Sequence, residues 1–149
     1  MEKSDQTVKY FVVAAIRRHS IEMTAWSGTH LWDDTHKLDK SLLTHLSLEK
    51  GELPILYSFV DQSNWTMFTS RAVVFLHQGV HARVLLSEIS DVSAGNFKGH
   101  GRQSTELLSL KTADGIIHKC PYRTGHESIG TLYAIKTLLQ TRSASVQRD

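Results

Sequence analysis

The chain has 149 residues, 40% of them hydrophobic and 21% charged, and these are the proportions of an ordinary globular protein. They exclude a disordered chain, which combines low hydrophobicity with high charge, and the length predicts one domain that buries a core without disulfides. The net charge of +2 comes from scattered Lys and Arg residues, so no nucleic acid is expected among the partners.

The sequence shows neither an export signal nor a membrane-spanning segment, and a cytoplasmic protein is expected. Cys120 is the single cysteine, which excludes an intrachain disulfide and leaves a reducing cytosol as the default. The apolar run at residues 10–16 is much shorter than the roughly 20 residues that cross a bilayer. Glu2 and Asp5 precede this run, where a signal peptide carries positive charge.

Two helical segments are expected before residue 51. In residues 5–18 apolar side chains recur with the spacing of one helix face, although their β-branched and aromatic character also allows a strand: Val8, Phe11, Val12, Ala15 and Ile16. Residues 21–26 predict a short strand or a loop. Asp39 suits the N-cap of a short helix that Gly51 would end. Residues 1–50 are therefore expected to form a partly helical extension packed on the same domain.

Seven short strands are expected after Gly51, because the apolar period changes to two, as in an antiparallel sheet. The runs are 54–60, 65–69, 72–77, 80–86, 88–93, 105–112 and 115–121. Turn residues separate these runs. Gly79 and Gly115 suit tight hairpin turns, because glycine adopts the positive φ that such turns need.

A helix is expected to follow the strands. Thr124 and Glu127 have the spacing of a capping box. An apolar stripe with Tyr133 beside it then runs to about residue 140: Ile129, Leu132, Ile135 and Leu139. The domain proper is therefore expected to cover residues 51–141, followed by a flexible polar tail at 142–149.

Seven strands followed by one amphipathic helix is the order of a pleckstrin-homology-like (PH-like) barrel. The segments LEKGELPILYSFVD and NWTMFTSRAVVFLH resemble the entry of GRAM and bacterial PH-like domains, where a Gly-Glu pair precedes strand one and a Thr-x-Arg step joins strands two and three. SEISDVSAG and LLSLKTADGIIHKC resemble the family's fifth strand and its sixth-to-seventh hairpin. The resemblance covers about residues 49–140. It implies a mainly β, α+β fold, a seven-stranded antiparallel barrel or sandwich capped by the C-terminal helix.

Nine histidines make metal binding a hypothesis to weigh. The better candidate is the segment HLWDDTH, which offers two imidazoles and two carboxylates: His30, Asp33, Asp34 and His36. Its spacing matches neither a metalloprotease helix nor a calcium loop. The alternative is that an acid caps a turn while Leu31 and Trp32 anchor the loop on the barrel.

The pair His77 and His81 flanks a predicted hairpin turn and could converge on one ion. A structural zinc needs three or four ligands, however, and this hairpin supplies no further Cys or carboxylate. Solvent-facing strand positions are therefore the simpler interpretation of the pair.

The loop 95–102 combines glycines with two cations and an aromatic residue, which could cradle a phosphate. It joins two predicted strands, however, and phosphate loops typically lead into a helix. A mobile loop that contacts a partner is the preferred interpretation. The predicted partner-binding residues are therefore Phe97, Lys98, His100 and Arg102 in this loop, with Trp32, Asp33 and Asp34 in the extension.

No arrangement for catalysis is evident in the sequence. The chain lacks a Gly-x-Ser-x-Gly elbow, and Cys120 lies in an apolar strand beside Pro121, as expected of a buried, inert thiol. Phosphoinositide-binding PH domains carry clustered Lys and Arg between strands one and two, whereas residues 61–64 here contain an acid and no base.

The sequence therefore predicts a non-catalytic binding module without a cofactor, most simply for another protein, for example as an immunity or inhibitor-type protein. A metal-dependent protein or enzyme that uses His30, Asp33 and His36 is one alternative. Binding to lipid or a membrane surface through the PH-like fold is another.

Overall fold

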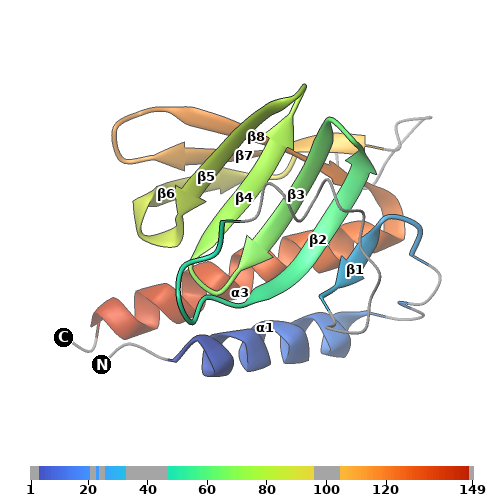
Figure 1. Cartoon of the computed structure of the whole chain (residues 1–149). Coiled ribbons are helices and arrows are strands. Elements are labelled where there is room, and N and C mark those ends of the chain that lie inside the picture. The colour runs from blue at the N-terminus through green and yellow to red at the C-terminus, as the bar shows by residue number, and fades with distance from the viewer. Residues whose placement is uncertain (1–3, 21–22, 24–25, 33–46, 96–104, 148–149) are drawn as a thin grey trace.

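The computed structural model describes residues 4–20, 23, 26–32, 47–95 and 105–147, with residues 142–147 as backbone only. These residues form an α+β fold with two antiparallel sheets and two long helices (Figure 1). The elements are α1 (Asp5–His19), β1 (Thr29–Leu31), β2 (Pro54–Asp61), β3 (Asn64–Thr69), β4 (Ala72–His77), β5 (Val80–Leu85), β6 (Ile89–Ser93), β7 (Thr105–Thr112), β8 (Ile117–Arg123) and α3 (Ser128–Gln147). Two one-turn 3-10 helices, η2 (Leu86–Glu88) and η3 (Gly125–Glu127), lie between them.

The strands form a five-stranded sheet, in the order β1-β2-β3-β4-β5, and a three-stranded sheet, in the order β6-β7-β8. The seven strands predicted from alternation are confirmed to within two residues at their ends, and β1 adds an eighth from the N-terminal extension. The short helix η2 turns the chain out of the first sheet before β6 begins. Neither sheet closes into a barrel; instead β8 packs across β2, β3 and β4.

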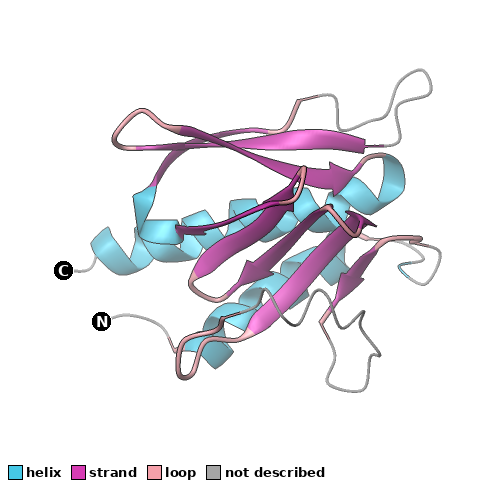
Figure 2. Ribbon diagram, turned by 45° about the horizontal axis from the view of Figure 1, so that its top comes forward, coloured by secondary structure: helices cyan, strands magenta, loops and turns pink. Residues whose placement is uncertain are grey.

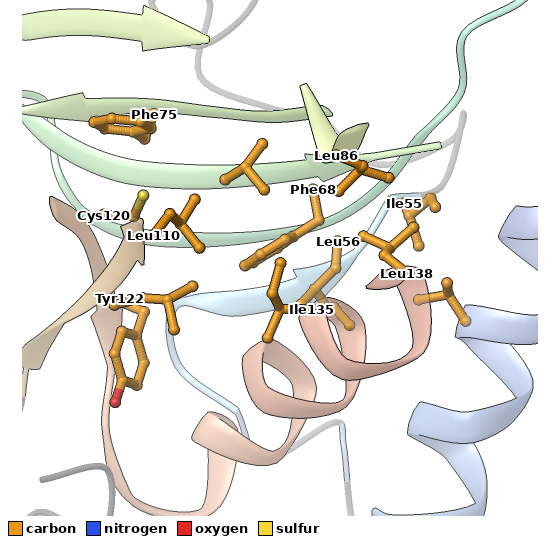
Figure 3. Close-up of a cluster of buried hydrophobic side chains, with 14 of the residues drawn as sticks. Ile55, Leu56, Phe68, Phe75, Leu86, Leu110, Cys120, Tyr122, Ile135 and Leu138 are labelled. Carbon is orange, nitrogen blue, oxygen red and sulfur yellow. The ribbon is translucent and has the colours of Figure 1, made fainter. Parts of the chain in front are cut away.

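The main core lies between the inner face of the five-stranded sheet, the three-stranded sheet and the two helices. Inward-facing positions of the large sheet alternate along each strand, and Figure 3 shows Leu56, Phe68 and Phe75 facing Leu110 and Ile135 across this core. All five side chains are buried. This single core is what holds the two sheets against the helices.

The outer face of the five-stranded sheet is also apolar. Its central side chains are buried and form a second cluster: Tyr57, Trp65, Met67, Val74 and Leu76. Burial on both faces explains why β4 reads as a nearly continuous apolar run.

The segment that allowed either a helix or a strand forms the helix α1, and the local sequence explains where this helix begins and ends. The Ser4 side chain accepts a hydrogen bond from the Thr7 backbone N–H (3.1 Å), and Asp5 lies in the positive first turn. Arg17, Arg18 and His19 lie in the negative last turn. Figures 1 and 2 show α1 and α3 side by side and running in opposite directions.

The buried face of α1 is narrower than the sequence predicts. Val8, Val12 and Ile16, spaced by four residues, are buried in the main core. Phe11, which the predicted stripe placed with them, is 43% exposed, so this part of the prediction is wrong. The reason is that α3 lies alongside α1 and leaves the Phe11 face outside their contact.

Helix α3 is turned relative to the predicted stripe. Ile135 is buried as expected, but Thr131, Ala134 and Leu138 complete the buried face, and Ile129, Leu132 and Leu139 are only half-buried. Gly130 permits this orientation, because a Cβ there would lie 3.0 Å from the Trp26 ring. α3 also continues to Gln147, beyond the predicted end near residue 140.

Glu127 does not complete the predicted capping box, since the Thr124 side chain does not cap η3. The Glu127 carboxylate instead accepts hydrogen bonds from the Ser27 N–H (3.2 Å), the Ser27 hydroxyl (2.9 Å) and the Gly28 N–H (3.0 Å). Burial alone would raise the pKa of Glu127, but these hydrogen bonds outweigh it and lower the pKa below its ordinary value. Glu127 therefore ties the start of the C-terminal helix to the N-terminal extension.

Within the described residues, neither helix combines the length and the apolar character that crossing a bilayer requires.

Candidate functional site

Two of the predicted site residues, His30 and Trp32, lie within the described residues, and both are on the outer face of the five-stranded sheet. The ring of His30 lies 5.5 Å from that of Tyr57, and the ring of Trp32 lies 6.3 Å from it, edge to face. The Trp32 backbone N–H donates to the Ile55 carbonyl (2.7 Å). Trp32 is half-buried against the outer cluster, so it anchors its segment on the sheet.

The other predicted site residues stay predictions, because they lie outside the described residues: Asp33, Asp34, His36, Phe97, Lys98, His100 and Arg102. The structure therefore tests neither the metal hypothesis for the first segment nor the partner loop around residue 97.

The histidine pair of the β4–β5 hairpin does not converge on one point. His81 is opposite Leu76, whose side chain belongs to the outer cluster, whereas His77 is opposite Val80, one position further along. Because side chains alternate between the faces of a strand, His77 and His81 project from opposite faces of the hairpin. A shared metal ion is therefore excluded for this pair.

Metal-binding and thiol chemistry have little support elsewhere in the part of the chain that the structure describes. No group of three or more His, Cys, Asp or Glu side chains gathers there in a way that could hold a metal. Cys120 is fully buried, and its burial raises the pKa of the thiol, so the reactive thiolate is disfavoured.

A surface groove of about 420 Å³ lies between α1 and α3 and is here called the helix groove. One stripe of each helix forms a wall, and the spacing in each is i, i+3, i+4, i+7, i+8. The α1 wall is Phe11, Ala14, Ala15, Arg18 and His19. The α3 wall is Tyr133, Lys136, Thr137, Gln140 and Thr141. The ten described residues that line the groove all belong to these two helices. No other described element covers it, so the groove is open on the side away from the core.

The chemistry of the helix groove is apolar and basic. Arg18, His19 and Lys136 are basic side chains that line it, and no Asp or Glu is among its ten described lining residues. The imidazole of His19 stacks on the Tyr133 ring, with centroids 4.0 Å apart and planes at 9°, and Lys136 Nζ lies 5.6 Å from the same ring centroid. The groove can therefore hold a ligand that is apolar on one side and carries negative charge.

The charge in the helix groove is concentrated at one end. His19 meets Tyr133, and the antiparallel helices place Phe11 toward Gln140 and Thr141 at the other end. Phe11 and His19 are eight positions apart on α1, which corresponds to about 12 Å along the helix axis. The groove is thus about two turns long, with its cations where α1 ends.

An ion-paired contact fixes the start of α1, and hence the α1 wall, on the sheet. Arg71 donates to both oxygens of Asp5 (Nε–Oδ1 3.0 Å, Nη2–Oδ2 2.8 Å), and the Ser70 hydroxyl donates to Oδ1 (2.6 Å). The hydrogen bond from Arg71 is the main cause of a pKa of Asp5 below its ordinary value. Ser70 and Arg71 belong to the turn between β3 and β4, so α1 is tied to that turn.

A buried ion pair lies beside this contact. Arg83 Nη1 donates to Oε2 of Glu52 (3.0 Å), and Arg83 Nη2 lies 2.9 Å from Oε1 as an ion pair; the Glu52 side chain is 0% exposed. The Thr69 hydroxyl and the Glu49 N–H also donate to this carboxylate. Burial would raise the pKa of Glu52, but these donors lower it below its ordinary value. Three hydrogen-bond donors and the paired guanidinium hold the carboxylate ionised, which is a structural role.

The sequence reasoning missed the helix groove. Each wall has a recognisable helical spacing, and Arg17, Arg18 and His19 form a basic end of the first segment. No sequence signal showed that α1 lies against α3, however, and the groove exists only where the two stripes meet.

Comparison of the chain with protein-family models, with curated proteins and with solved structures finds no match. The physical properties of the helix groove are therefore the basis for assigning a function.

Proposed function

We propose that this protein is a non-catalytic binding module that receives a protein partner in the helix groove. The supporting observation is the composition of that groove, which joins aromatic and alanine side chains to three basic ones, with no carboxylate among the described residues that line it. Grooves between helices are a common way to bind a segment of another protein, whose apolar side chains enter the groove while its polar groups pair at the rim.

The openness of the groove favours a protein over a small molecule. Small-molecule pockets enclose most of their ligand's surface. The described residues that line this groove come from two antiparallel helices only, which leaves it open on one side. Phe11 and Tyr133, at its two ends, provide the large aromatic contacts that typically dominate protein interfaces.

We also infer that residues 49–140 are a PH-like domain located in the cytoplasm. In support, β2–β5 form a four-stranded meander, β6–β8 a three-stranded one, and α3 follows them. In this interpretation α1 and β1 are additions, and the proposed binding surface combines the added helix α1 with the helix α3 of the domain.

Site-specific photo-crosslinking in the source cells tests the binding function. A photo-reactive residue at position 14, in the groove, is compared with one at position 119, which is exposed on β8. The groove position should cross-link a defined protein that the control position does not. Adding Ala15→Trp, which fills the groove, should remove that product. If both positions capture the same proteins, or if position 14 captures none, the proposed function is wrong.

A further inference from the structure

We propose that the segment received by the helix groove is an acidic amphipathic helix, which lies along α1 and α3 as a third helix. This inference rests on the proposed function, since it names the class of partner for the same groove.

The sign of the partner's charge follows from the lining residues. Arg18 and His19 also complement the negative end of the α1 dipole, so their position has a structural reason. Lys136 lies in the middle of α3, where no helix end calls for a cation, and it is exposed. The basic side chains thus come from both walls. Because no carboxylate is among the lining residues that the structure describes, they favour a partner with carboxylates at the matching end.

The shape of the groove favours a helix. Ala14 and Ala15 of the α1 wall have small side chains, which leave room for a ridge of larger side chains from a partner. Phe11 and Tyr133 stand at the two ends of the groove, about two helical turns apart. Leu or similar side chains one turn apart on a helix would therefore enter between the two aromatic rings.

A second copy of this chain fits the groove less well. Two helix grooves brought together would offer no carboxylate from the described lining residues to pair with Arg18 and Lys136, so this contact lacks charge complementarity.

An anionic bilayer also fits less well, because it is flat. It would reach Tyr10, which is 71% exposed, and Phe11, but it would leave the groove beside Ala14 and Ala15 unfilled. A helix fills the groove and meets the basic side chains at the same time.

Three synthetic peptides of about 16 residues test the partner class. The first has Leu on one helix face and Glu beside it toward one end, the second has Lys in place of each Glu, and the third has the composition of the first in shuffled order. Fluorescence anisotropy with the full chain measures their affinities at low salt. The Glu helix should bind about tenfold or more tightly than either control, because both charge and periodicity contribute.

Substitutions in the protein test whether the preference for the Glu helix arises in the helix groove. Arg18→Glu and Lys136→Glu should each weaken binding of the Glu helix about tenfold, whereas Lys119→Glu, an equal charge change on β8, should leave it within about twofold. Ala15→Trp should abolish binding. Circular dichroism of each variant confirms that it is folded, and added salt should weaken the wild-type complex.

The outcomes separate this inference from the proposed function. If position 14 cross-links a partner but the Glu helix binds no better than the Lys or shuffled peptide, the acidic-helix inference is overturned and the binding module stands. Sedimentation with phosphatidylserine vesicles that Arg18→Glu removes would overturn it in favour of a membrane surface. Loss of the position-14 cross-link instead overturns the proposed function itself.

Discussion

Replacing Arg83 with Met should strongly destabilise the protein, because it leaves the Glu52 carboxylate buried without its guanidinium. Glu52 is 0% exposed and Arg83 is 23% exposed at the side chain, so solvent cannot take the place of the lost donor. Breaking a buried ion pair by removing one partner typically costs about 3–5 kcal/mol. Since a domain has a free energy of unfolding of about 5–15 kcal/mol, this variant should approach the limit of folding.

The loss in Arg83→Met should depend on pH. In the wild type the pKa of Glu52 is lowered, so the stability that its ionised form contributes is present above the unfolded pKa of about 4.3 and is lost as pH falls through the folded pKa. In the variant, burial becomes the dominant effect and should raise the pKa of Glu52. Protonation then relieves the unpaired charge, so the difference from wild type should shrink between pH 7 and about pH 5.

Urea unfolding followed by tryptophan fluorescence measures both effects, because Trp26 and Trp65 are buried. The double variant Arg83→Met with Glu52→Leu should recover much of the stability, since no charge is then buried. Arg71→Met is the matched control: its partners Asp5 and Glu49 are partly exposed, so its loss should be clearly smaller. A loss for Arg83→Met below about 1 kcal/mol, or one that does not shrink at lower pH, would refute the reasoning.

Three further predictions concern the fold. Gly28→Ala should lower the free energy of unfolding by about 1–3 kcal/mol in thermal melting, because its Cβ would lie 2.5 Å from the Phe59 carbonyl oxygen; an unchanged melting temperature would contradict this. Glu127→Gln should destabilise by about 1–3 kcal/mol at pH 7, since bonds from Ser27 and Gly28 then reach a neutral group. That difference should disappear as pH falls below about 4, because the pKa of Glu127 is lowered and its charged form stabilises the fold only above this range. A difference independent of pH would argue against an ionised Glu127 as the acceptor of these bonds. Cys120 should resist iodoacetamide in the native protein and react in urea, as followed by mass spectrometry, whereas rapid native labelling would show that it is accessible.

The strands were predictable because their signals are local. Period-two alternation and the glycines at the hairpin turns located β2–β8 closely, since both depend on a few neighbouring residues. Gly79 and Gly115 indeed have φ of +80° and +88°.

The helix faces and Glu127 were harder to predict, because distant packing decides them. Phe11 belongs to the apolar pattern of its segment, but only the neighbouring α3 determines that it lines a groove and not the core. Glu127 has a capping-box spacing, yet its carboxylate binds residues 99 and 100 positions earlier in the chain. Such long-range partners leave no trace in a local pattern.

The groove's two walls have a consequence for the synthesis of the protein. α1 ends at His19 and α3 begins at Ser128, so roughly 110 residues must be made between them, which takes about 5–20 s at ordinary translation rates. Until α3 leaves the ribosome, Val8, Val12 and Ile16 lack part of their cover, and the proposed binding surface is incomplete. A partner that needs both walls can therefore engage only chains whose translation has passed α3, so premature termination would produce chains that do not compete for it.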